Sequence, residues 1–208
     1  MRAAGKRQKI PSGYDQSAPG VMVMFTLLVL LTTGAVTLVI ERRQGLLRRL
    51  AATPISSGAI VSGKWASRLI LGMVQVAFAL AAGALLFKVD WGPSLPTVLL
   101  VLAGWSALCA SAGMLLGNLV KSEGQAIGIG VLSANLLAAF GGCWWPVEIT
   151  PRWMQALAGA LPTGWAMDAL HQLVNFQAGA GSAVSHVLLL FGTSIVITWL
   201  AARTFRYQ

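Results

Sequence analysis

Few residues of this sequence belong to types that could do chemistry. Asp168 and His171 are three positions apart and would share one face of a helix, where a carboxylate and an imidazole could act as an acid-base pair. No nucleophile or third ligand accompanies them, and an enzyme acting on lipid within the membrane would also need His186 to converge on the pair. A polar face turned toward water explains both residues more simply, so the sequence assigns no catalytic residue.

Two further patterns lack the context that their chemistry requires. The run 58–65 nearly matches the phosphate-binding loop GxxxxGK[ST], but Trp65 replaces the hydroxyl that would hold magnesium, no β-strand precedes the run and an apolar stretch follows at once. Cys109 and Cys143 lie in apolar surroundings without metal-ligand or disulfide spacing. We therefore predict no cofactor, no metal site and no ATPase within the chain.

The composition places these residues in a membrane protein. Of 208 residues, 56% are hydrophobic and 10% are charged, whereas a soluble domain has about 25% charged residues. The net charge of +9 does not indicate nucleic-acid binding, because the basic residues are dispersed around apolar stretches. The sequence predicts an all-α polytopic membrane protein of a bacterial inner membrane.

Five stretches are apolar enough to cross a bilayer, and two short helices precede the last one. The predicted spans are 20–40, 69–87, 95–116, 124–141 and 184–202, and the predicted interfacial helices are 152–161 and 163–174. One side would hold nine basic residues, namely Arg42, Arg43, Arg48, Arg49, Lys64, Arg68, Lys121, Arg203 and Arg206. The outer loops would hold only Lys88 and Arg152, so the positive-inside rule places the first side in the cytoplasm. The four remaining basic residues, Arg2, Lys6, Arg7 and Lys9, would lie outside and depart from the rule.

The stretch Glu41–Pro54 directly follows the first span and contains four arginines. A helix over 45–52 would place Leu46, Leu47 and Leu50 on one side and lie along the membrane surface. Pro54 would end this helix, because proline lacks a backbone donor and biases Thr53 away from helical geometry. At the end of a span, Glu41 would need a partner, and Arg42, Arg43, Lys64 or the start of the surface helix could supply it.

This stretch resembles a segment of the permease subunits of type 2 ABC exporters, called the ABC-2 family. The matching positions are Glu41, Arg42, Gly45, Leu50, Thr53 and Pro54. The resemblance implies that 45–52, with Leu46 and Leu47, is the coupling helix that docks on a separate ATP-binding subunit. Leu46 and Arg48 depart from the family pattern, which often has threonine and an acidic residue there. A basic surface helix lying on anionic lipid is the simpler interpretation of the same residues.

The resemblance also implies how the chain is organised. It covers about 16–206, and such permeases usually begin with an earlier span and a large extracytoplasmic domain. By this comparison the chain corresponds to the C-terminal portion of a permease, with a polar basic segment over 1–19 and the transmembrane domain over 20–208. A fragment that associates with a full-length permease without transporting is the alternative.

Two other motifs fit the same interpretation. Trp144, Trp145 and Pro146 follow the fourth span and resemble an outer-loop element of the family, either a gate or an interfacial aromatic belt. The GxxxG patterns at 113–117 and 124–128 would let helices approach closely. We expect them to pack within the chain, and a seam between two copies is the alternative.

These expectations combine into one predicted function. The chain would be the permease subunit of an ATP-driven exporter of a lipophilic or amphipathic substrate, not an enzyme itself. Its expected partners are an ABC ATP-binding subunit, a second permease copy or paralogue, and membrane lipids, with no nucleic acid. The membrane-embedded enzyme acting on lipid is the alternative.

Overall fold

The computed structural model describes residues 13–177 and 179–205, most of which are helical. Five long helices are α1 (Tyr14–Arg43), α3 (Ser57–Leu86), α4 (Leu95–Leu119), α5 (Glu123–Phe140) and α8 (Val184–Thr204). The short elements are α2 (Leu46–Ala51), η1 (Val147–Ile149), α6 (Arg152–Ala160), α7 (Pro162–Leu170), η2 (His171–Asn175) and η3 (Ala180–Ala183). All five long helices are sufficiently long and apolar to cross a membrane, which confirms the predicted fold class.

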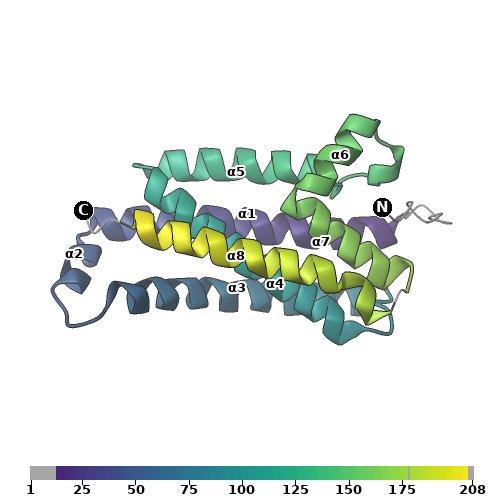
Figure 1. The fold of residues 1–208 in the computed structure, drawn as a ribbon, viewed down its shortest axis with the longest axis horizontal. Coiled ribbons are helices and arrows are strands. Elements are labelled where there is room, and N and C mark those ends of the chain that lie inside the picture. Colours follow the sequence, from purple (N-terminus) through teal and green to yellow (C-terminus); the bar gives the residue numbers. More distant parts are fainter. Residues whose placement is uncertain (1–12, 178, 206–208) are drawn as a thin grey trace.

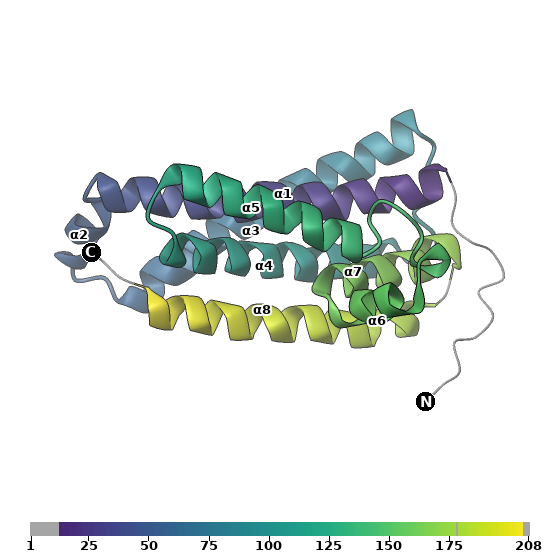
Figure 2. The ribbon, with the colours of Figure 1, turned by 90° about the horizontal axis from the view of Figure 1, so that it is seen from above.

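The long helices run side by side in an elongated bundle with α4 at its centre (Figures 1 and 2). In the most apolar part of α4, 72% of the residues are buried, compared with 17% in α3 and in α8. Trp105 of α4 is almost fully buried, and its indole Nε1 donates to the carbonyl oxygen of Val23 in α1 at 3.0 Å. The outer helices therefore present apolar side chains outward, as helices in contact with lipid do.

Glycines set the close contact between α1 and α4. A Cβ atom at Gly113 would lie 2.5 Å from the carbonyl oxygen of Leu30, and one at Gly117 would lie 3.0 Å from Leu38 Cβ. The expected packing of this GxxxG pattern within the chain is confirmed. For the second pattern the expectation is wrong, because a methyl group added at Gly124 or Gly128 would meet no atom within 4 Å, so both glycines face open space.

A cluster of hydroxyl groups joins three helices toward the middle of the bundle. Ser111 of α4 is fully buried, and its Oγ lies 3.0 Å from Ser194 Oγ and 2.7 Å from Thr198 Oγ1, both in α8. Trp65 of α3 donates its Nε1 to the same Ser111 oxygen at 3.0 Å. Ser111 also donates to the carbonyl oxygen of Ala107 at 2.8 Å. Polar bonds of this kind hold helices together where apolar packing alone gives little preference.

The two ends of the bundle are built differently. The basic end comprises the C-terminus of α1, all of α2, the start of α3, the α4–α5 connection and the C-terminus of α8. The hairpin end comprises the start of α1, the α3–α4 connection, α6 and α7 (Figure 1). Of the described basic side chains, only Lys88 and Arg152 lie at the hairpin end. The predicted grouping of basic residues therefore holds for the described residues, while Arg206 lies outside them.

The first helix begins earlier than the sequence predicts. We expected the span to start at Gly20 after a polar segment, but α1 begins at Tyr14 and includes Pro19. The polar residue Gln16 is only 4% exposed because its amide Nε2 donates to the carbonyl oxygen of Gly142 at 2.9 Å. Of the predicted N-terminal segment 1–19, residues 1–12 lie outside the described residues.

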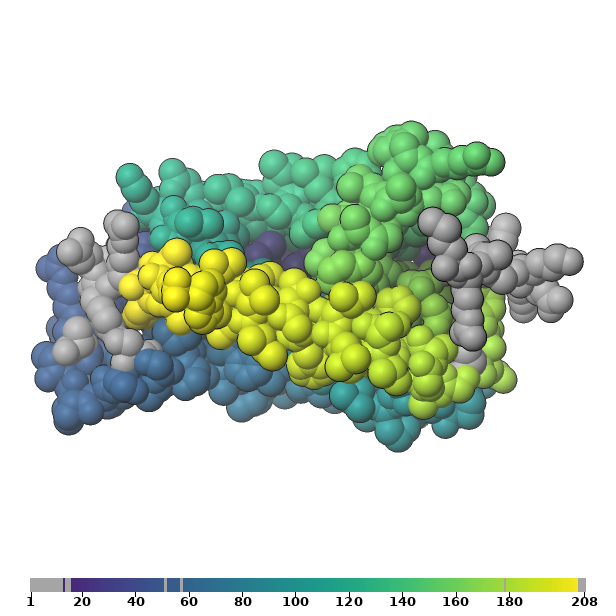
Figure 3. Space-filling model, viewed as in Figure 1, coloured from purple at the N-terminus to yellow at the C-terminus, as the bar shows by residue number. Residues whose placement is uncertain are grey.

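On one face of the molecule, α5 and α8 are separated by a hollow (Figure 3). Between α5 and α8, Figure 3 shows a hollow at the bottom of which atoms of α1 are visible. This face is lined by one helix from the middle of the chain and the last helix, with the first helix beneath them.

Candidate functional site

A sharp corner joins α1 to α2 at the basic end. The chain leaves α1 at Gln44 and reverses at Gly45, whose φ of 70° lies in the left-handed region. This conformation costs an L-residue with a side chain roughly 1–2 kcal/mol, which glycine avoids. The carbonyl oxygen of Gly45 then accepts from Arg49 N at 3.1 Å, so the corner leads directly into the helix.

The short helix α2 ends as the sequence predicts. Thr53 donates from its hydroxyl to the carbonyl oxygen of Leu50 at 2.6 Å, and Pro54 follows outside the helix. Two residues later Ser56 caps the start of α3, and its Oγ accepts from Ala59 N at 3.3 Å. Both termini of the α2–α3 connection are therefore fixed by side-chain hydrogen bonds to the backbone.

The leucines of α2 do not share one environment. Leu47 is fully buried and anchors the helix, whereas Leu46 is 40% exposed and Leu50 is half-buried. The expected grouping of Leu46, Leu47 and Leu50 on one side therefore does not describe their contacts. Arg48 and Arg49 are exposed, so the outer surface of α2 combines one apolar and two basic side chains.

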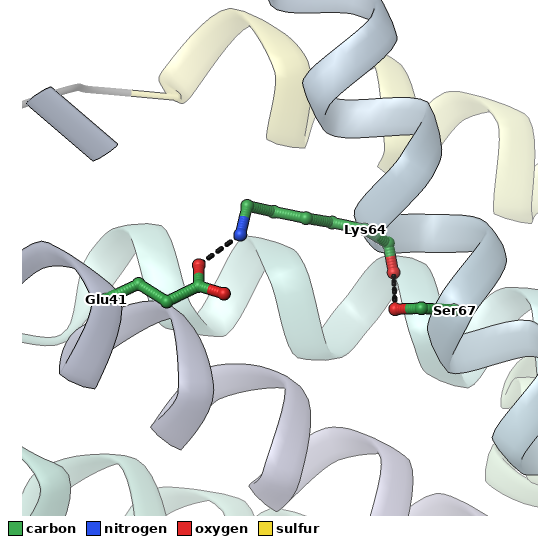
Figure 4. A network of polar contacts seen from close by, with 3 residues as sticks. All are labelled: Glu41, Lys64 and Ser67. Atoms are coloured by element: carbon green, nitrogen blue, oxygen red, sulfur yellow. Dashed lines mark hydrogen bonds and ion pairs between the residues drawn. The ribbon is translucent and has the colours of Figure 1, made fainter. Parts of the chain in front are cut away.

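Glu41, in the last turn of α1, pairs with Lys64 in the second turn of α3 (Figure 4). The two side chains are 23% and 21% exposed, respectively, so most of each lies within the protein. Lys64 is one of the partners predicted for Glu41, and it is the one that Glu41 contacts in the structure. The same lysine belongs to the run 58–65, which is helical here and does not form a phosphate-binding loop.

Arg42 bonds to the end of α4. Its Nη1 donates to the carbonyl oxygen of Val120 at 3.1 Å, and its Nη2 donates to that of Gly117 at 2.9 Å. The last carbonyl groups of a helix have no partner within the helix and carry a partial negative charge, so a guanidinium group satisfies both needs. No spacing in the sequence indicates these carbonyl partners, which depend on where α4 ends relative to α1.

Arg43 makes the third contact, with Glu123 at the start of α5. Its Nη1 lies 3.6 Å from Glu123 Oε1, and both side chains are largely exposed. Three consecutive residues of α1 thus contact three different helices, α3, α4 and α5. They lie two to four residues before the corner at Gly45, which leads into α2.

The polar residues of the hairpin end form a second candidate site. Asp168, His171 and His186 all line a pocket of about 270 Å³, and Asp168 Oδ2 lies 3.1 Å from His186 Nε2. Asp168 also accepts from Gln172 Nε2 at 2.7 Å. His171, the first residue of η2, is only 3% exposed, so the expectation of a polar face turned toward water is wrong for it.

The lining of this pocket limits what the acid-base pair could do. The residues that surround it, other than the three titratable ones, are Val147, Gln155, Ala158, Gly159, Gly164, Trp165 and Met167. None of these side chains is a nucleophile of the kind that hydrolytic enzymes use. Among the described residues no group of three potential metal ligands comes together either.

The aromatic pair lies against the start of α1. Trp144 is 50% exposed and its Nε1 lies 3.0 Å from the sulfur of Met24, while Trp144 and Trp145 meet edge to face with ring centroids 5.7 Å apart. Pro146 precedes the short helix η1. The arrangement suits rings at the membrane interface, and their assignment as an outer gate stays a prediction.

The cysteines are buried and carry free thiols. Burial raises the pKa of the Cys143 thiol to about 12. The thiolate is the nucleophilic and metal-binding form, so Cys143 is unreactive at neutral pH. This agrees with its interpretation as a small apolar residue.

The sequence is similar to a known family and to several known proteins. Residues 4–203 match the model of a family described as ABC-2 family transporter protein. The chain is 28% identical over 190 residues to the linearmycin resistance permease protein LnrN of Bacillus subtilis (strain 168), which covers 90% of this chain and 46% of that protein. It is 27% identical over 158 residues to the probable multidrug ABC transporter permease YbhR of Escherichia coli (strain K12), covering 74% of this chain and 42% of that protein.

A eukaryotic protein matches the same region. The chain is 26% identical over 188 residues to ABC transporter G family member 20 of Dictyostelium discoideum, covering 89% of this chain and 25% of that protein. The chain therefore spans less than half the length of the curated relatives that it matches.

Proposed function

Because the chain belongs to the ABC-2 family of transporter membrane proteins, we propose that it is the permease part of an exporter driven by ATP hydrolysis in a separate subunit. The basic end would face the cytoplasm of a bacterial cell, across the inner membrane, where the positive-inside rule places it. The helix α2 would then lie where a soluble ATP-binding subunit can reach it.

The observation that carries the proposal is the succession of Glu41, Arg42 and Arg43 before the corner at Gly45. Each of the three residues contacts a different helix, so a force applied to α2 would reach α3, α4 and α5 together. Packed helices respond to such forces by small rigid shifts between discrete arrangements. Closure of the ATP-binding subunits would thus be converted into re-packing of the spans.

The exposed surface of α2 supplies the proposed docking contacts. Leu46 would enter an apolar pocket of the ATP-binding subunit, and Arg48 and Arg49 would meet acidic or polar groups there. Leu47 is buried and would hold α2 on the bundle instead of contacting the partner. Leu50, Thr53 and Pro54 would define the end of the docking segment.

Co-purification in mild detergent with the candidate ATP-binding subunit tests this docking. We expect Leu46→Asp to abolish association, because it places a charge in an apolar contact, and Gly45→Pro to do the same, because proline cannot adopt φ near 70°. The matched control is Leu119→Asp, which changes a leucine that is 67% exposed at the same end but outside α2.

Each outcome of this experiment is informative. Loss of association in the two α2 variants and its retention in Leu119→Asp would support docking through α2. Equal association of all variants would move the docking surface elsewhere. A wild-type chain that binds no ATP-binding subunit at all would favour the fragment that does not transport.

The proposed cargo is lipophilic or amphipathic. The membrane-spanning windows of the five long helices hold few charged residues, which would stabilise a strongly charged solute poorly. The relatives are named for resistance to linearmycin and for multidrug transport. ATP-dependent loss of an amphipathic dye from vesicles containing both subunits, with no loss of a polyanionic dye, would agree with this class of cargo.

A second permease copy would pack on α5. Gly124 and Gly128 leave open space on its outer face, and Leu132, one turn further along, is 62% exposed. Oxidation of a Gly128→Cys variant should then give a covalent dimer. Gly192→Cys is the matched control, because Gly192 is also an exposed helical glycine in open space but lies on α8. Dimers formed by the control alone would contradict a seam on α5.

A membrane-embedded enzyme acting on lipid is the alternative function. The observation in its favour is that Asp168 and His186 come together in one pocket. No serine, threonine, cysteine or lysine is among the described residues that line that pocket, which weighs against an enzyme. Asp168→Ala separates the two functions, because an exporter should keep its transport while an enzyme would lose its activity.

A further inference from the structure

A second pocket at the basic end lies between the α4–α5 connection and the C-terminus of α8. It has a volume of about 580 Å³, and Arg42, Lys121 and Arg203 contribute to its lining. These three cations come from three different parts of the chain, α1, the α4–α5 connection and α8. The pocket therefore concentrates positive charge that is dispersed in the sequence.

The carboxylates at this end of the described chain are already occupied elsewhere. Glu41 pairs with Lys64, and Glu123 lies beside Arg43. Neither Lys121 nor Arg203 has a carboxylate partner among the described residues, and both are exposed. The charge of the pocket is thus available to an external anion.

Hydrogen bonds between elements fix the walls of the pocket. Arg42 holds the carbonyl groups at the end of α4, as described above. Asn118 donates from Nδ2 to the carbonyl oxygen of Ala201 at 2.8 Å and to Thr204 Oγ1 at 3.1 Å, which ties the end of α4 to α8. The guanidinium carbon of Arg203 lies 3.8 Å from the centroid of the Trp199 ring, a cation–π contact that orients the arginine.

An apolar stripe leads from this pocket along the surface of α8. Thr204 lines the pocket, and Leu200 and Val196 precede it by one and two helical turns on the same face. They are 40% and 56% exposed, respectively. A ligand held in the pocket could therefore extend an apolar chain along α8 toward the centre of the membrane.

We propose that this pocket binds the phosphate headgroup of an anionic phospholipid, whose acyl chain lies on the Val196–Thr204 stripe. Basic pockets between the ends of membrane-spanning helices are suited to such headgroups. Lys121 and Arg203 contact the phosphate. Arg42, which is already bonded to the end of α4, adds its positive charge to the pocket. The inference depends on the bundle lying in a membrane and does not depend on export.

The test uses the purified full chain in a neutral detergent and follows its thermal unfolding after addition of phosphatidylglycerol, phosphatidylcholine or inorganic phosphate. We expect phosphatidylglycerol alone to raise the melting temperature, as a ligand that binds only the folded state does. The affinity derived from its titration should fall about fivefold in Lys121→Gln and about thirtyfold in the double variant Lys121→Gln/Arg203→Gln, since each cation near the headgroups contributes roughly that factor.

The matched control is Arg48→Gln/Arg49→Gln, which removes two exposed charges from the same end of the bundle but outside the pocket. It should keep the response to phosphatidylglycerol. If the control and the pocket variants lose the response equally, or if neither loses it, the pocket is not the site. If inorganic phosphate stabilises the wild-type chain as well as the lipid does, the ligand is a soluble phosphate and the lipid proposal is overturned.

A variant that loses stability could also lose lipid binding, so the test needs one substitution that leaves the fold intact. Arg203 contacts Trp199, so its substitution could weaken the fold. The Lys121 side chain is exposed and makes no hydrogen bond or ion pair with a described residue, so the single variant Lys121→Gln isolates the effect on binding. An unchanged lipid affinity in that variant would contradict the proposal by itself.

Discussion

The basic end and the hairpin end of the bundle are held together by different kinds of contact. At the basic end, charged side chains reach from α1 to α3, α4 and α5. At the hairpin end, backbones touch directly, because Gly20 of α1 packs against the carbonyl group of Cys143 and Gly92 packs against that of Leu173. A long side chain can change its conformation when a helix shifts and so keep its contact. Two backbones in direct contact leave no room for such a shift. The long side chains near α2 therefore leave more room for small shifts, except between α1 and α4, which are also in close contact at Gly117.

The largest expected effect comes from disturbing the backbone contact at the hairpin end. A methyl group at Gly20 would overlap the carbonyl oxygen of Cys143, so Gly20→Ala should lower the free energy of unfolding by about 3 kcal/mol, as overpacking of a rigid core does. Thermal unfolding of the detergent-solubilised chain measures this. Gly159→Ala is the control, because Gly159 lies in α6 with open space around it and should change stability by less than about 1 kcal/mol. Equal melting temperatures for both variants would mean that the hairpin end is not rigid.

A smaller effect is expected at the basic end from the pair Glu41–Lys64. Glu41→Gln should lower the free energy of unfolding by about 2 kcal/mol, because a charged hydrogen bond in a largely covered position is lost. The exchange variant Glu41→Lys/Lys64→Glu restores opposite charges across the same gap and should recover part of the loss. If the exchange is no better than either single substitution, the two residues do not act as a pair.

The smallest effect is expected for Arg43 and Glu123, whose side chains are 58% and 44% exposed. A double-mutant cycle with Arg43→Gln and Glu123→Gln should give a coupling energy of about 0.2–1 kcal/mol that decreases as salt is added. A larger coupling that is insensitive to salt would show that this contact belongs with the covered pair at Glu41 and not with ordinary surface ion pairs.

The sequence predicts the long helices and the local signals well. Hydrophobic length placed all five spans, and Ser56 and Thr53 mark helix termini where short-range hydrogen bonds form. Such signals depend on residues within a few positions of one another, and a single sequence contains them. The family resemblance at Glu41–Pro54 likewise rested on one continuous stretch, and the match over residues 4–203 agrees with it.

The errors concern contacts between residues far apart in the chain. Gln16 is polar and suggested a segment before the span, but a carbonyl group 126 positions away makes its burial favourable. Two identical GxxxG patterns differ in environment, because only the one in α4 meets a neighbouring helix. His171 is buried for the same reason. No periodicity distinguishes these cases, since each depends on which helix happens to lie alongside.

The hydroxyl group of Ser111 has more neighbours than it can bond. A serine hydroxyl offers one donor hydrogen and two acceptor positions, yet the carbonyl oxygen of Ala107 and polar atoms of Trp65, Ser194 and Thr198 all lie within hydrogen-bond distance of it. One of the four contacts is therefore unmade at any moment. The hydroxyl can therefore distribute its hydrogen bonds among α3, α8 and its own helix α4 in more than one way.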